Sequence, residues 1–188
     1  MHRAQIPPRK YEEYAYVLDF NSRGKSSTVR GREGIIITAI GEDRLTILEI
    51  LGIPNSTFEI GEKIYIGKEG RTKVLSVLGK MEYDKISSSA QSELESVVQK
   101  IVTNNESKFV EYLNNARPLT PRIHALELIP GIGKTYMKNM LEERDKKKFE
   151  SYHDLQERVG FKEPIKHISE RIIHEITGES RMNLFVKR

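Results

Sequence analysis

The sequence has 188 residues, enough for one domain or two small ones, and its lack of cysteine excludes disulfides, a zinc ribbon and a cysteine nucleophile. The net charge of +4 is uneven, because residues 117–188 hold 15 Lys and Arg against 11 Asp and Glu while residues 1–116 balance. No apolar run has the length of a membrane span and the first residues lack a signal-peptide core, so we expect a cytoplasmic protein with no membrane partner.

The first part of the chain has the pattern of a small antiparallel β-barrel, placed at residues 13–82 after a basic N-terminal arm over residues 1–12. Residues 14–20 alternate with the period of a strand, and four further strand-like runs follow, separated by glycine-rich turns. These runs lie at residues 35–40, 45–51, 63–66 and 73–78. Five short strands joined in this way are typical of a barrel, so the sequence predicts an α+β fold.

A long polar loop, residues 21–34, separates the first two predicted strands. Its cations are Arg23, Lys25, Arg30 and Arg32. The strand count and this basic loop resemble the OB-fold, which often binds oligonucleotides through its face and its first loop. The resemblance implies that these cations contact phosphates and that Tyr14, Tyr16 or Tyr65 stacks on bases. The alternative for each tyrosine is a core position, because alternation turns one face of every strand inward.

Helical periodicity replaces the strand pattern after residue 82. Apolar residues recur at helical spacing over residues 90–101 and again over residues 109–116, and Ser87 is one of three serines that could cap the first helix. Residues 83–116 are therefore predicted to form two helices that bridge the barrel and a C-terminal all-α domain.

The C-terminal domain is predicted to begin with two helices joined by a tight turn. Thr120 can cap a helix and Pro121 fits its first position, so a helix is predicted over residues 121–129. A Pro-Gly pair then ends this helix, and a second one is predicted over residues 134–145.

The turn between these helices carries the strongest functional signal in the chain. Gly131 and Gly133 flank Ile132, which can pack into the angle between the helices while the backbone amides face outward. Free N–H groups at a helix start, together with the positive end of the helix dipole, form an anion site. Lys134 lies in the first helical turn, where a cation opposes the dipole unless an anion is bound.

The segment from Pro130 to Gly133 between two short apolar helices resembles the helix-hairpin-helix motif, which grips a nucleic-acid backbone without regard to sequence. The phosphate contacts that the resemblance implies fall on Gly131, Gly133, Lys134, Thr135 and Lys138. The alternatives are a plain structural turn or a hairpin that binds protein. A P-loop is excluded, because that motif requires glycine where this chain has Leu128.

A second helix pair completes the C-terminal domain, residues 117–178. Ser151 followed by Asp154 has the pattern of a helix start, and Gly160 ends that helix. Pro164 opens a further helix that runs to the end of this range, so the domain resembles a tandem helix-hairpin-helix unit. The second turn lacks the Gly-x-Gly pattern and is interpreted as structural.

The sequence does not assemble a catalytic constellation, so we expect a non-enzymatic protein with no cofactor and no metal. His167 and His174 are two helical turns apart and would not share a metal. Asp154 lies downstream of the glycine turn at a distance that resembles DNA glycosylases, but a helix cap explains it without catalysis. Because nuclease carboxylates can come from distant positions, a glycosylase or nuclease stays open as an alternative.

The order of barrel, two helices and tandem hairpin resembles an uncharacterised archaeal family of predicted RNA- or nucleic-acid-binding proteins. Residues 179–188 would follow as a tail or a late strand. The resemblance implies a nucleic-acid partner, RNA or DNA, held at the hairpin with a second contact surface on the barrel. A protein-interaction adaptor is the other alternative.

Overall fold

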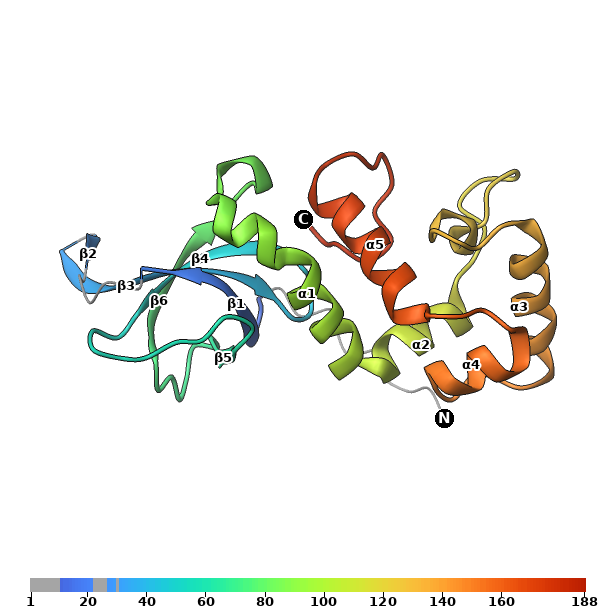
Figure 1. Cartoon of the computed structure of the whole chain (residues 1–188), viewed down its shortest axis with the longest axis horizontal. Coiled ribbons are helices and arrows are strands. Elements are labelled where there is room, and N and C mark those ends of the chain that lie inside the picture. The colour runs from blue at the N-terminus through green and yellow to red at the C-terminus, as the bar shows by residue number, and fades with distance from the viewer. Residues whose placement is uncertain (1–10, 22–26, 30) are drawn as a thin grey trace. The chain divides into compact units, whose positions relative to one another are not determined.

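The computed structural model describes residues 11–21, 27–29 and 31–188 of the chain (Figure 1). The chain divides into two compact units, one of residues up to Gln91 together with Arg188 and one of Ser92–Lys187. The first unit contains a curled antiparallel sheet and the second is helical, which confirms the α+β class. Most of the basic arm expected over residues 1–12 lies outside the described residues.

Strands of the first unit form one sheet with the order β5-β1-β3-β4-β6, in which neighbours are antiparallel. The strands are β1 (Tyr14–Phe20), β2 (Ser27–Val29), β3 (Arg32–Gly41), β4 (Ile47–Gly52), β5 (Lys63–Tyr65) and β6 (Val74–Lys80). The five predicted strands are present, and β2 is an additional short strand that, among the described strands, pairs with β3 alone. Within the described residues β5 and β6 do not pair, so the sheet is a half-barrel and not a closed barrel.

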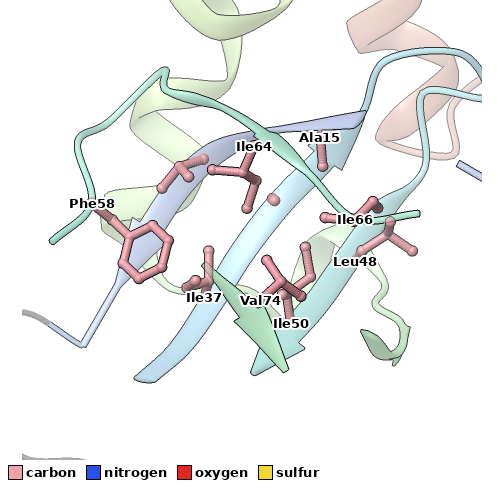
Figure 2. Packing of buried hydrophobic residues seen from close by; sticks show 10 residues of the cluster. Ala15, Ile37, Leu48, Ile50, Phe58, Ile64, Ile66 and Val74 are labelled. Atoms are coloured by element: carbon pink, nitrogen blue, oxygen red, sulfur yellow. The ribbon is translucent and has the colours of Figure 1, made fainter. Parts of the chain in front are cut away.

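The core of this unit lies on the concave face of the sheet, where side chains from several strands point toward one another (Figure 2). The residues are Ala15, Val17, Ile37, Ala39, Leu48, Ile50, Phe58, Ile64, Ile66 and Val74. Tyr16 is fully buried, and its hydroxyl donates to Glu42 at 3.0 Å. Tyr16 is therefore a core residue and cannot stack on a base, whereas Tyr14 is partly exposed and meets Tyr65 edge to face at 5.4 Å.

Arg71 bridges part of the gap between the unpaired strands β5 and β6. Its guanidinium donates to the carbonyl oxygens of Ile66 and Gly67, just beyond β5, at 3.0 and 2.7 Å. It also donates to the carbonyl oxygen of Leu75 in β6 at 3.0 Å. A side chain thus supplies hydrogen bonds where backbone pairing would close a barrel.

Helices follow the sheet, and two of them begin at serine caps. The helical elements are η1 (Tyr83–Lys85), α1 (Ser88–Asn104), α2 (Glu106–Asn115), η2 (Ala125–Leu128), α3 (Lys134–Lys146), α4 (Tyr152–Val159) and α5 (Pro164–Ile176). The Ser87 hydroxyl accepts the Ala90 amide at the start of α1, and Ser151 caps α4 in the same way. Among the described helices, none has the length and apolar character needed to cross a membrane.

The prediction of an α-helix over residues 121–129 was wrong. The chain there folds back on itself through a bridge between Pro118 and His124, and only the short 3-10 helix η2 forms. Thr120 does not cap a helix, because its hydroxyl accepts the amides of Arg122 and Ile123 in a local turn. His124 provides the cap of η2 in its place.

After α5 the chain turns back along that helix (Figure 1), and the described residues 179–188 contain no strand. The fully buried carboxylate of Glu175 anchors this segment, because it accepts the backbone amides of Leu184, Phe185 and Val186. Arg171 pairs with Glu175 at 2.8 Å. The segment is therefore fixed to the helical unit and is not a loose tail.

Candidate functional site

The turn between η2 and α3 combines a buried anchor with an exposed backbone. Ile132 is 4% exposed, and its amide donates to the carbonyl oxygen of Ile129 at 3.1 Å. Gly131 before it has a φ of +83°, a conformation that favours glycine. The turn is thus held from inside by an apolar side chain, as the sequence predicted.

Gly133 is the N-cap residue of α3, and its glycine identity is not required by the fold. Its φ of −85° and ψ of −173° are extended values that any residue adopts. A Cβ at this position would have none of the atoms that the structure describes within 4 Å. Serine, threonine, aspartate or asparagine would fit and would cap the helix, so glycine here keeps the helix start uncovered.

The first amides of α3 have no acceptor in the described part of the chain. Among the described residues, the N–H groups of Gly133, Lys134 and Thr135 donate to no other group. In contrast, α4 begins with the Ser151 hydroxyl as a cap and with Asp154 in its first turn, whereas the first turn of α3 has no acidic residue. The start of α3 is therefore a set of unsatisfied donors at the positive end of a helix dipole.

Lys134 does not simply extend toward solvent. Its ammonium lies 2.8 Å from Oε1 of Glu127, and the other carboxylate oxygen accepts the His124 amide at 2.7 Å. The Lys134 ammonium, followed by the His124 amide, lowers the pKa of Glu127 from its ordinary value. Sequence reasoning did not identify Glu127, although His124 and Glu127 have the spacing of a capping box.

The remaining predicted hairpin residues lie along the exposed side of α3. Thr135 and Lys138 are exposed, and in this 13-residue helix only Met140 is buried. A helix with so little burial presents a broad surface beside the amides. Gly131, Gly133, Lys134, Thr135 and Lys138 thus lie on one turn and the helical turns that follow it.

The two turns of the helical unit are packed together by aromatic rings, which the sequence did not predict. The ring of Phe161, from the turn between α4 and α5, lies 5.6 Å from Tyr136 and 5.0 Å from His167. His167 in turn lies against Gly131. The glycine turn is therefore supported from the start of α5.

The predicted contact surface on the sheet is described only in part. Arg32 begins β3, pairs with Val29 of β2 and is exposed. The other three predicted cations, Arg23, Lys25 and Arg30, lie outside the described residues.

The carboxylate considered for catalysis has structural partners. Asp154 accepts the Glu150 amide at 3.0 Å and pairs with Arg158 at 3.1 Å, and these contacts lower its pKa. Within the described part of the chain, no group of three His, Cys, Asp or Glu residues could hold a metal ion.

A family model described as a protein of unknown function, DUF655, matches residues 11–187. The chain belongs to this family. It is 39% identical over 182 residues to the uncharacterized protein MJ0038 of Methanocaldococcus jannaschii, which covers 96% of this chain and 82% of that protein. The crystal structure of Af1531 from Archaeoglobus fulgidus, a DUF655 protein, is similar with a TM-score of 0.80 and 36% identity. That match covers 94% of this chain and 100% of the solved one, so the α+β fold is shared within this archaeal family.

Proposed function

We propose that this protein binds the phosphate backbone of nucleic acid, largely without regard to sequence and without catalysis, through the exposed amides at the start of α3. The turn and α3 would then act as a helix-hairpin-helix motif whose first helix is reduced to η2. The observation that supports this proposal most strongly is Gly133, an N-cap glycine with ordinary backbone angles and open space around it.

The physical argument concerns what glycine leaves uncovered. A capping side chain would satisfy the amides of Lys134 and Thr135 internally and would stand in front of them. Without it, the donors are oriented by the helix and require an acceptor from outside, and a phosphate oxygen is a strong, charged acceptor. Lys134 and Lys138 would add charge that makes binding sensitive to salt.

A second contact surface on the half-barrel is the other part of the proposal. The curled sheet is similar to a partly open OB-fold, and its exposed Arg32 would contribute a phosphate contact together with Arg23, Lys25 and Arg30. Two weak contact surfaces on one chain increase overall affinity when both can engage the same polymer.

The test is fluorescence anisotropy with single- and double-stranded DNA and RNA over a salt series. The variant is Gly133→Asp, which places a carboxylate over the amides and also supplies a helix cap, so the fold is retained. The matched control is Asn139→Asp, which adds the same charge to an exposed position of α3 away from the amides.

Binding that weakens steeply with salt, is lost in Gly133→Asp and survives in Asn139→Asp supports the amide site. Equal binding by Gly133→Asp and the native chain contradicts it and assigns binding to the sheet. No binding to any of the four polymers at low salt rejects the proposed function and favours a protein-interaction adaptor. Cleavage or base removal on these substrates favours the enzymatic alternative.

A further inference from the structure

We infer that residues 117–124, here called the finger, act as an apolar wedge that inserts at a weakened step of double-stranded nucleic acid. This inference rests on the proposed function and specifies its substrate class, a duplex with a gap or mismatch. The finger lies between α2 and η2 and takes the place of the predicted helix.

The finger is a braced structure. The Leu119 amide donates to the carbonyl oxygen of Ile123 at 2.8 Å, and the Ala125 amide donates to that of Arg117 at 3.1 Å. The Thr120 hydroxyl accepts two amides within the loop, at 3.2 and 3.0 Å. Because these bonds fix the backbone before binding, insertion would cost little additional ordering.

The finger exposes apolar side chains on both sides of its turn, residues 120–122. Leu119 is 43% exposed and Ile123 is 38% exposed, and Pro118 and Pro121 are exposed beside them. Leucine, isoleucine and proline are side chains with which proteins wedge open base steps in the minor groove.

The charge of the finger matches a polyanion. Arg117 and Arg122 are exposed, and their guanidinium groups have no ion-pair partner among the described residues. No acidic residue occurs from position 117 to position 126. Exposed apolar side chains with one cation at the base of the finger and one in its turn fit a nucleic-acid groove better than an uncharged partner surface.

A single carboxylate joins the base of the finger to the amide site. Glu127 accepts the amide of His124, the last residue of the finger, and pairs with Lys134 at the first position of α3. The Glu127 side chain therefore connects the base of the finger directly to Lys134, one of the proposed phosphate contacts. A duplex whose backbone is held at α3 would place neighbouring base steps within reach of the finger.

Unstacking a base step is costly in an intact duplex and cheaper at a gap or mismatch. An apolar wedge therefore adds net affinity mainly where the step is already weakened. The amide contacts alone carry no such preference, because phosphates are the same in both duplexes.

The experiment uses the full chain with duplexes that carry 2-aminopurine, either intact or beside a single-nucleotide gap, in DNA and in RNA. The chain has no tryptophan, so 2-aminopurine fluorescence reports unstacking without protein background. The variant is Leu119→Ser with Ile123→Ser, which keeps Thr120 and both arginines. The control is Ile60→Ser, which removes another apolar side chain of 42% exposure outside the finger.

We expect the native chain and Ile60→Ser to raise the fluorescence of the gapped duplex, and the double variant to lose this rise together with roughly ten-fold of its affinity for that duplex. Affinity for the intact duplex should change much less. Binding without any fluorescence rise, or a rise that survives in the double variant, overturns the wedge and leaves the proposed function intact. If light scattering shows that the native chain forms dimers and the double variant does not, the finger is a protein contact. That outcome also overturns the wedge. No binding to any polymer rejects the proposed function itself.

Discussion

The imidazole ring of His167 lies directly against Gly131, so that a Cβ on this glycine would be 2.9 Å from Cε1 of the ring. The left-handed backbone at position 131 favours glycine, and the close ring independently leaves no room for a larger residue. Gly133, two residues later, has neither constraint. One glycine of the turn is thus explained by backbone conformation and packing, whereas neither requires the other to be glycine.

Gly131→Ala should therefore lower the free energy of unfolding by about 1 to 3 kcal/mol, because alanine is strained at positive φ and its methyl group displaces His167. Gly133→Ser is the control and should change this free energy by only a few tenths of a kcal/mol. Urea unfolding followed by circular dichroism measures both. Equal stability of the native chain and Gly131→Ala would contradict the packing argument.

Glu127→Gln should strengthen binding to nucleic acid a few-fold and increase the dependence on salt by about one ion. The substitution releases Lys134 from its ion pair, while the glutamine oxygen can still accept the His124 amide. The matched control is Glu82→Gln, which breaks the exposed pair with Lys85 elsewhere in the chain. Anisotropy at several salt concentrations measures both variants, and weaker binding by Glu127→Gln would count against Lys134 as a phosphate contact.

The free energy of unfolding should decrease as the pH falls, and part of this decrease should come from protonation of His124. Burial, followed by the nearby charge of Arg144, lowers the pKa of His124, and its Nδ1 accepts the Leu126 amide only when it is unprotonated. The unfolded chain therefore takes up a proton near pH 6.5, before the folded chain does. The stabilisation that unprotonated His124 contributes is complete above that pH. It is lost as the pH falls through the lower pKa that His124 has in the folded chain.

His124→Asn keeps a side-chain cap without this titration, so its urea midpoint should fall less between pH 7.5 and pH 5 than that of the native chain. Urea unfolding at both pH values makes the comparison. An identical fall in the two proteins would assign the acid sensitivity to other groups.

Glu175→Gln should be strongly destabilising, by about 3 to 5 kcal/mol, because Arg171 is left as an unpaired buried cation. The substitution also replaces one of the two oxygens that hold the backbone of residues 184–186. Glu179→Gln is the control, since its exposed pair with His174 should contribute no more than about 1 kcal/mol. Similar urea midpoints for the two variants would show that the anchor is not important for stability.

Three helix starts were predictable from sequence because their causes are local. Ser87, Ser151 and Pro164 each lie at or next to the residue where a helix begins. The glycine turn was predictable for the same reason, since Gly131 and Gly133 act through their own backbone. The strands followed from alternation and turns, although the short strand β2 lay in a segment that was predicted to be a loop.

Features that depend on distant partners were not predictable. Thr120 and Pro121 form a good helix start in isolation, but the bridge between Pro118 and His124 folds this segment into the finger. His167, which packs against Gly131, lies 36 positions away from it in the sequence. The Glu175 anchor likewise depends on backbone that carries no sequence signal.

The bridge formed by Arg71 also occupies part of the open edge of the sheet. An open sheet exposes strand edges, and such edges recruit further strands into aggregates. On β6, the carbonyl oxygen of Leu75 that an incoming strand could use is already occupied by a guanidinium, and β5 has only three residues to offer. An incoming strand would find this acceptor occupied and a cation beside it, which disfavours strand pairing at this point of the edge.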